Sequence, residues 1–305
     1  MVNVFCLALA TVKTTDRTIE NRARPVAQAL GKAAPRAHGA CMDETDDLGD
    51  NEAPPIATPA ATVVVFRRDP AGGPAQILMV ERSSEMKFAG GATVFPGGKV
   101  DPDDHDLAQR FGSHLDPEDA AAHVAAVREA LEETGLAIGI AGDVTAQTAA
   151  EARRVAISTG RLADALAHFG WSLDLDSLVP WARWWPRHRH IRVFDTRFYL
   201  ADLGTGAVDI AVDATENRHL FWASASEALR LADEGAIKVI FPTRRNLERL
   251  AAHADFERCR AHALATPVTT ITPRIELRDG VKWLTIPPEA GYPYDGEPLE
   301  SASRA

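Results

Sequence analysis

Three carboxylate side chains, those of Glu129, Glu132 and Glu133, lie within one five-residue stretch. If this stretch is helical, Gly135 is expected to end the helix, which places all three carboxylates in its last two turns. The helix dipole is already negative there, so each carboxylate costs roughly 0.3–1 kcal/mol. A divalent cation would offset this charge, because Mg²⁺ takes oxygen ligands from a few carboxylates and completes its shell with water and substrate phosphates. The cluster therefore indicates metal-dependent phosphate chemistry.

An ordinary solvated helix face is the alternative interpretation of these glutamates. Such a face usually carries interleaved lysines, whereas the only cation in this stretch is Arg128, four residues before Glu132. Glu129 and Glu133 also form a like-charge i,i+4 pair, which adds to the unfavourable charge. We therefore favour the metal site, with Arg128 orienting Glu132 rather than touching a substrate.

A helix with one apolar stripe must position the cluster. At about 100° per residue, Val124, Val127 and Leu131 fall on one side and the glutamates on the other. Asp116 is suited to cap its start and Pro117 to occupy the first helical position. The sequence thus predicts a helix from Pro117 with one face in the core.

Arg-Glu-Ala-Leu-Glu-Glu-Thr-Gly-Leu at 128–136 resembles the second half of the Nudix box, and Phe-Pro-Gly-Gly at 95–98 resembles its opening. In the family motif the last glycine of the opening and the arginine lie 14 residues apart, whereas Gly98 and Arg128 lie 30 apart. The box is therefore split by 16 extra residues, and Asp104 stands where the family has its first glutamate. This departure leaves a ligand role for Asp104 in question.

The extra residues, 101–116, are rich in aspartate. They could form a second metal or substrate site, or an acidic solvated loop. We favour the loop, because connecting segments are mostly polar surface.

The resemblance implies an α/β Nudix fold, in which a mixed β-sheet lies between helices (α/β/α). It also implies hydrolysis of a nucleoside diphosphate linked to another group, with Mg²⁺ or Mn²⁺ as cofactor. The metal ligands would be Glu129, Glu132, Glu133 and the carbonyl of Gly98.

Arg128, Glu132 and Glu133 are also the expected catalytic residues, together with a glutamate from a distant loop. Glu216 is our candidate for this glutamate, although Asp209, Asp213 and His219 offer the same chemistry.

The lead-in to the glycines resembles the signature of a Nudix subset that cleaves coenzyme A. Its spacing is kept by the expected substrate-binding residues, which are Arg82, Lys87, Gly91, Phe95 and Gly97. Met79, Val80 and Lys87 depart from the signature, and lysine in place of arginine keeps the charge but loses bidentate phosphate geometry. The split box and the segment 180–198 are similar to the coenzyme A diphosphatase branch that includes the peroxisomal mammalian enzyme.

Two other functions stay open. Another Nudix substrate, such as ADP-ribose or a dinucleotide, would make Arg82 and Lys87 incidental. A Nudix-fold binding or regulatory module is the other alternative, and the complete glutamate cluster speaks against it. The tryptophans at 181–185 could stack on adenine or pack in the core, and we favour packing because large aromatic side chains bury so much area.

Alternating and β-rich segments predict strands, and 3.6-residue periodicity predicts helices. The expected strands are 61–67 and 76–82, paired as a hairpin, then 92–95, 136–140, 193–203 and 220–223. The expected helices after the glutamates are 147–157, 162–169, 226–233 and 242–253, whereas 180–186 reads as a turn-rich aromatic segment. The tail is expected to form strands around the hairpin signal Asp279-Gly280.

We expect a loosely attached N-terminal segment (1–57), a Nudix domain (58–265) containing the insertion 101–116, and a C-terminal tail of strands (266–305) that packs on the domain. The N-terminal segment has too little apolar periodicity to bury itself.

The net charge of −10 and the pI near 5.5 argue against a nucleic-acid or anionic-membrane partner and favour a small-molecule diphosphate as the partner. Cys6, Cys41 and Cys259 have no CxxC spacing, and no apolar run approaches the roughly 18 residues that span a membrane. We expect a cytoplasmic protein and leave a homodimer open.

Overall fold

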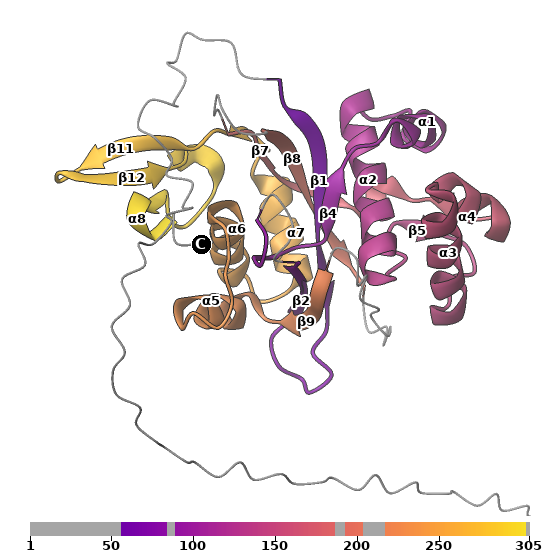
Figure 1. Ribbon diagram of the computed structural model, residues 1–305, viewed down its shortest axis with the longest axis horizontal. Helices are drawn as coiled ribbons and strands as arrows, with labels where there is room; N and C mark the ends of the chain where they lie inside the picture. The colour runs from indigo at the N-terminus through magenta and orange to yellow at the C-terminus, as the bar shows by residue number, and fades with distance from the viewer. Residues whose placement is uncertain (1–55, 84–88, 187–192, 204–216, 303–305) are drawn as a thin grey trace, which may run out of the picture. The chain divides into compact units, whose positions relative to one another are not determined.

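A mixed β-sheet carries the fold (Figure 1). The computed structural model describes residues 56–83, 89–186, 193–203 and 217–302. Within these residues the sheet has eight strands in the order β10-β7-β8-β1-β2-β3, with β4 paired to β1 and β9 paired to β2. Their bounds are β1 Thr58–Arg67, β2 Gln76–Arg82, β3 Thr93–Val94, β4 Gly97–Lys99, β7 Val179–Trp184, β8 Phe194–Asp202, β9 Asn217–Ala223 and β10 Thr270–Ile271.

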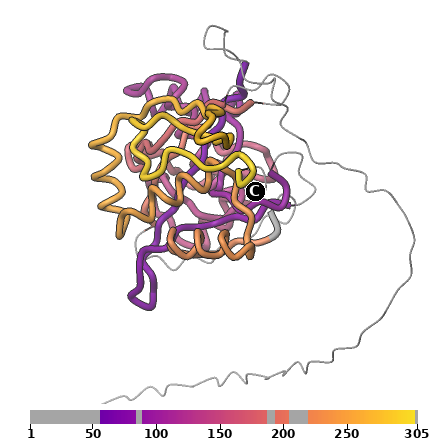
Figure 2. The backbone as a smooth tube through the Cα atoms, turned by 90° about the vertical axis from the view of Figure 1, so that its left-hand side faces the viewer, coloured from indigo at the N-terminus to yellow at the C-terminus, as the bar shows by residue number. Residues whose placement is uncertain are grey.

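The central strand β1 is buried on both faces, which explains its nearly continuous apolar sequence. Val63 and Val65 face one core, and Val64 and Phe66 face the other. β1 pairs in parallel with β8 and antiparallel with β2 and β4. The hairpin expected from β1 and β2 is confirmed, and the turn between them, drawn in indigo, extends beyond the neighbouring helices (Figure 2).

Helices cover both faces of the sheet, so the expected α/β/α fold is confirmed (Figure 1). One face carries α1 Pro102–Phe111, α2 Pro117–Thr134, α3 Ala146–Thr159 and α4 Leu162–Phe169. The other face carries α5 Ala225–Asp233, α6 Phe241–Ala251 and α7 Phe256–Ala265. We call the two buried clusters the α2-side core and the α6-side core. None of the helices in the described ranges combines the length and the apolar character that crossing a bilayer requires.

Two small sheets and short helices complete the described chain. β5 Ile140–Ala141 pairs with β6 Ser172–Leu173, and β11 Arg274–Arg278, β12 Val281–Thr285 and β13 Gly296–Pro298 form the other sheet. The short helices are η1 Leu175–Ser177, η2 Pro288–Ala290 and α8 Leu299–Ala302. Asp279 and Gly280 both have positive φ, 50° and 79°, as a two-residue hairpin turn requires. The hairpin signal in the tail is therefore confirmed.

The helix that carries the glutamates, α2, begins and ends where the sequence predicts. The Asp116 side chain accepts hydrogen bonds from the backbone N–H groups of Glu118 and Asp119, and Pro117 occupies the first turn. Gly135 ends the helix in a left-handed conformation, with φ of 79°. Its apolar stripe is fully buried, and alanines bury much of the remaining surface. The helix thus lies inside the α2-side core, and small side chains let its neighbours approach closely.

The insertion 101–116 is not the expected acidic loop. Residues 102–111 form α1, which begins with Pro102 and a capping box between Asp101 and Asp104. Leu107 and Ala108 pack into the α2-side core. The loop prediction was wrong because two apolar residues and one buried carboxylate are enough to dock a short helix on α2.

Three other expectations need correction. The segment 180–186 contains strand β7, because Trp181 and Trp184 point into the α6-side core while Pro180 lies at a register shift that tolerates proline. The expected strand 136–140 is reduced to its last residue, since Gly139 takes a positive φ of 61° and breaks the extended chain. Helix α7 was not expected, and its weak apolar periodicity explains why.

Candidate active site

Strand β4 brings two glycines against β1, where there is no room for a side chain. Gly97 pairs with Thr62 and Gly98 pairs with Ala61. A Cβ on Gly97 would overlap the carbonyl oxygen of Ala61, and a Cβ on Gly98 would overlap the carboxylate of Glu129. Glycine is required at position 97, where backbone already fills the space, and a side chain at position 98 would displace the Glu129 carboxylate.

The last turns of α2 meet these glycines. The backbone N–H of Gly97 donates to Oε2 of Glu133 at 3.0 Å, and Glu133 is only 4% exposed. Glu129 lies against the backbone of Gly98. The structure therefore brings together residues that lie more than thirty positions apart in the sequence.

Arg128 connects two of the glutamates to the inserted helix. Its NH1 donates to Oε1 of Glu129 at 2.8 Å and to Oε2 of Glu132 at 3.2 Å. Its Nε and NH2 donate to the two carboxylate oxygens of Asp104, and NH2 also donates to the Lys99 carbonyl at 2.8 Å. Arg128 orients Glu132, as expected, and Glu129 as well.

Burial makes the ionised forms of Glu129 and Glu132 unfavourable. Burial raises the pKa of the Glu129 carboxyl to about 8, opposed by Arg128 and reinforced by Glu133 and Glu132. Burial also raises the pKa of Glu132, again against the effect of Arg128. Although burial opposes the charge of Arg128, its hydrogen bond to Asp104 and the surrounding carboxylates raise its pKa. Positive charge beyond Arg128 would therefore stabilise the ionised glutamates.

The donor set fits a hard divalent cation. It consists of three carboxylates and the backbone of Gly98, all oxygen donors of the kind that Mg²⁺ and Mn²⁺ accept. Within the described ranges no three carboxylate, imidazole or thiol groups already converge as a finished metal cluster. The reason is visible in the contacts, since Glu129 and Glu132 point to Arg128 while Glu133 accepts from Gly97.

Two of the expected substrate-binding residues, Arg82 and Gly91, lie at the last residue of β2 and in the turn before β3. Arg82 has a buried Nε with no hydrogen-bond partner among the described residues. The backbone N–H of Gly91 donates to the Arg82 carbonyl at 3.2 Å, and Gly91 has a positive φ of 74°. The turn before β3 is therefore tied to the strand that carries Arg82.

The other expected residues are placed differently. Phe95 is 2% exposed and packs in the α6-side core, so it supports the glycine turn from beneath. His219 is exposed on β9. Lys87 and Glu216 lie outside the described residues, as do Asp209 and Asp213.

The packing interpretation of the tryptophans is confirmed for two of them. Trp181 and Trp184 are 1% and 2% exposed. Their indole N–H groups donate to Oδ1 of Asn246 at 2.9 Å and to the Tyr292 hydroxyl at 3.1 Å. These side chains hold α6 and the C-terminal segment against β7.

Asp104 is the site residue whose role the sequence did not reveal. It is 1% exposed, although it stands among aspartates that read as a solvated surface. The one available signal was its position in the sequence: Asp104 follows Gly98 by the same number of residues as the first glutamate of the family motif follows its glycine.

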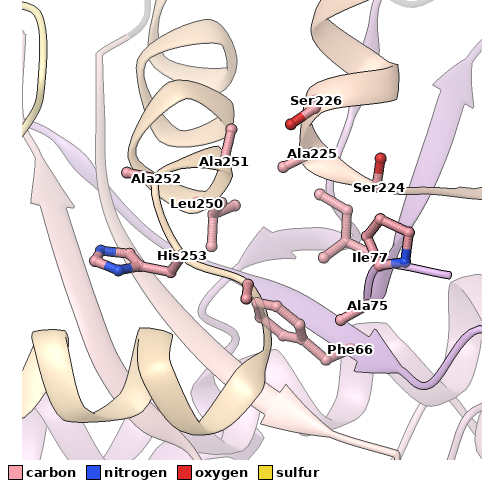
Figure 3. A pocket seen from close by; sticks show the side chains of 12 residues that line it. Phe66, Ala75, Ile77, Ser224, Ala225, Ser226, Leu250, Ala251, Ala252 and His253 are labelled. Carbon is pink, nitrogen blue, oxygen red and sulfur yellow. The ribbon is translucent and has the colours of Figure 1, made fainter.

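A separate hollow of about 460 Å³ lies between the β1–β2 hairpin and the ends of α5 and α6 (Figure 3). Phe66, Ile77 and Leu250 line it, with the hydroxyl groups of Ser224 and Ser226 above them. These apolar residues belong to the α6-side core, on the opposite face of the sheet from α2. No carboxylate lines the hollow, so it does not extend the metal site.

Comparison with known proteins finds similarity to Nudix proteins. A family model described as the NUDIX domain matches residues 57–241. Nudix hydrolase 7 of Caenorhabditis elegans is 25% identical over 185 residues, which cover 60% of this chain and 58% of that protein. The crystal structure of a NUDIX hydrolase from Alicyclobacillus acidocaldarius is 27% identical, with a TM-score of 0.56, over 68% of this chain and 96% of that chain. The chain thus spans somewhat more than half the length of the curated relative it matches.

Proposed function

The chain belongs to the Nudix family, and on that premise we propose that it is a metal-dependent hydrolase that cleaves the diphosphate of coenzyme A or acyl-coenzyme A. The products would be 3′,5′-adenosine bisphosphate and 4′-phosphopantetheine or its acyl form. The observation that carries the hydrolase assignment is the arrangement of Glu129, Glu132 and Glu133 beside the backbone of Gly97 and Gly98.

Glu129, Glu132 and Glu133 would hold Mg²⁺ or Mn²⁺ together with the carbonyl of Gly98. When bound, the metal supplies charge neutralisation at the diphosphate and activation of water. Arg128 keeps Glu129 and Glu132 on one side of the helix through its NH1 group. Its own position is set by Asp104, so the orientation of the carboxylates does not depend on a mobile side chain.

The backbone of the glycine turn contributes a second fixed element. The N–H of Gly97 donates to Oε2 of Glu133, which fixes this carboxylate beside the glycine turn. Glu133 is also only 4% exposed, so this carboxylate is largely shielded from bulk water. Proton transfer from the attacking water is proposed for Glu133 or for the distant Glu216.

Arg82 supports the coenzyme A assignment. Coenzyme A carries a 3′-phosphate in addition to its diphosphate, so its site needs cations beyond the metal. A buried guanidinium Nε without a partner in the described structure is suited to an incoming phosphate. Lys87, five residues further on, is the second cation that the resemblance assigns to this task.

A substrate panel tests the proposal. The full-length chain is given coenzyme A, acetyl-coenzyme A, ADP-ribose and a dinucleotide with Mg²⁺ or Mn²⁺, and the products are separated by chromatography. We expect kcat/KM for a coenzyme A substrate to exceed the others by at least about tenfold, or about 1.4 kcal/mol. Preference for ADP-ribose or a dinucleotide would reject the substrate. Absence of metal-dependent turnover on all four would support a binding module instead.

A matched pair of variants tests the role of Arg82. Arg82→Met should raise KM for coenzyme A by about tenfold, because one phosphate contact is lost. Arg230→Met is the control, since Arg230 is half exposed and pairs with Glu227 on α5. Equal KM values in wild type and both variants would remove Arg82 from the substrate site.

A further inference from the structure

The Glu132 carbonyl is one of the backbone carbonyls at the C-terminal end of α2 that lack a partner from the helix itself. Gly135 donates its N–H to Leu131, which closes the last regular turn. The N–H of Leu136, which would otherwise reach the Glu132 carbonyl, donates to the hydroxyl of Thr134 at 3.2 Å. Carbonyl groups in the last turn of a helix have no N–H partner within the helix and must find a donor outside it. The Glu132 carbonyl finds its partner in another helix.

Arg153 of α3 supplies that partner. Its Nε donates to the Glu132 carbonyl oxygen at 2.8 Å, across 21 residues of sequence. Helix α3 is fixed in place, because Ala149, Ala152 and Ala156 are at most 4% exposed and the last two belong to the α2-side core. The arginine therefore starts from a rigid backbone and ends on the turn that carries Glu132 and Glu133.

The positive charge of Arg153 offsets negative charge at the C-terminal end of α2. The last turn of α2 has no basic residue of its own, although three carboxylates lie near it. A guanidinium at a helix C-terminus interacts favourably with the negative end of the dipole. Arg128 already holds the side chains of Glu129 and Glu132, whereas Arg153 holds the backbone of the turn. The two arginines act on different parts of the same cluster.

We propose that Arg153 is a positioning residue for the metal site: by holding the Glu132 carbonyl it keeps the last turn of α2, and with it Glu132 and Glu133, in the arrangement that binds the metal. This inference rests on the proposed function. Arg153 lies outside the glutamate motif and would touch neither substrate nor metal.

Arg153→Met removes the hydrogen bond and the charge, and Arg153→Lys keeps the charge and a donor. Arg154→Met is a matched control with the same charge change, since the Arg154 side chain is 74% exposed and its ion pair within the described part of the chain is a long one, to Glu151 at 3.8 Å. Three quantities are measured on the full chain. They are hydrogen exchange of the amides 131–136 without metal, the Kd for Mn²⁺ by electron paramagnetic resonance, and kcat and KM for coenzyme A.

We expect Arg153→Met to exchange the amides 131–136 about tenfold faster and to bind Mn²⁺ about tenfold more weakly. Its kcat should fall at low Mn²⁺ and recover at high Mn²⁺, with KM for coenzyme A within about twofold of wild type. Arg153→Lys should recover most of the Mn²⁺ affinity, and Arg154→Met should match wild type.

Unchanged Mn²⁺ affinity in Arg153→Met would overturn the proposal, even if its melting temperature fell, because that result is what a purely structural role gives. Equal weakening in Arg153→Met and Arg154→Met would also overturn it, since loss of the contact with the Glu132 carbonyl could not then be the cause. A wild-type chain that binds Mn²⁺ but hydrolyses no diphosphate rejects the proposed function alone, because the exchange and affinity measurements still separate the variants. A wild-type chain that binds no Mn²⁺ rejects both.

Discussion

Asp104 and Arg128 form a bidentate ion pair inside the protein. Nε of Arg128 donates to Oδ1 of Asp104, and NH2 donates to Oδ2, both at 3.0 Å. Their side chains are 1% and 7% exposed. Asp104 belongs to the inserted helix α1 and Arg128 to α2, so the insertion is connected directly to the residue that orients Glu129 and Glu132.

Asp104→Asn should destabilise the protein by about 1.5–3 kcal/mol, because Arg128 loses its charged bidentate partner and keeps only the contacts of NH1 to Glu129 and Glu132 as ion pairs of this strength. It should also lower kcat, since Arg128 would be freer to move and to draw Glu129 and Glu132 away from a metal. Urea unfolding and steady-state kinetics measure the two effects. Asp103→Asn is the control, because Asp103 is 43% exposed and pairs with Arg161 at the surface. Equal stability of the two variants would contradict the buried-pair interpretation.

Glu133→Gln should reduce kcat by at least about a hundredfold while the fold is kept. The amide oxygen of glutamine can still accept the hydrogen bond from Gly97, so the glycine turn stays in place. What is lost is the charge that binds a cation or a proton. Steady-state turnover measures the fall in kcat, and near-ultraviolet circular dichroism checks that the fold is kept. Glu118→Gln, on the exposed first turn of α2, should keep wild-type activity. Near-normal turnover in Glu133→Gln would exclude Glu133 from the chemistry.

Mn²⁺ affinity should rise with pH and level off near the pKa of Glu129, which burial raises to about 8. Below that pH the metal-free protein keeps a proton on Glu129, and a cation must displace it. The rise should approach tenfold per pH unit, with release of about one proton on binding. Calorimetry in two buffers of different ionisation enthalpy measures the released proton. Glu129→Gln should bind weakly at every pH, and an unchanged pH dependence in this variant would assign the proton to another group.

The same pKa has a consequence for the metal-free protein. A carboxyl whose pKa is raised by folding stabilises the folded state fully below its ordinary value near 4.5, and this contribution is lost as pH rises toward 8. Glu129→Gln should therefore be more stable than wild type in chelator at alkaline pH. Adding Mn²⁺ should raise the melting temperature of wild type more than that of the variant. Thermal unfolding with and without chelator checks both expectations.

Acid should destabilise the protein through His123, which is 4% exposed. Burial lowers its pKa below 6.5, although the hydrogen bond to the Asp119 carbonyl at 2.7 Å opposes this effect. The unfolded chain therefore binds the proton first, and stability from this group falls as pH drops below about 6.5. In His123→Gln the urea midpoint should vary less between pH 7.5 and 5. His168→Gln, at an exposed position, should keep the wild-type dependence.

Local signals were sufficient to predict α2. An aspartate cap, a proline in the first turn and a glycine at the end act within a few residues of the backbone they serve. Local residues also predict the tail hairpin, because Asp279 and Gly280 take the positive φ values that its turn needs. The Gly98 turn and the glutamates were likewise recognised as one site, and the structure places them side by side.

Tertiary contacts decided what the sequence could not predict. Asp104 has acidic neighbours, and its burial is made favourable by the guanidinium of Arg128 together with the backbone N–H of Asp101. Arg153 gave no signal, because a contact from α3 to a backbone carbonyl leaves no pattern in side-chain types. Trp181 and Trp184 read as part of a turn because of the prolines around them, whereas their burial makes β7 a strand. Lys87 and Glu216 stay predictions.

The hydrogen bond from Gly97 to Glu133 joins residues 36 positions apart, across the whole of α1. In this chain the site is therefore defined by the arrangement of these residues in space rather than by a fixed spacing in the sequence. The intervening residues form a helix that returns one carboxylate to Arg128, so the extra length in the sequence does not move the glycines away from the glutamates in space.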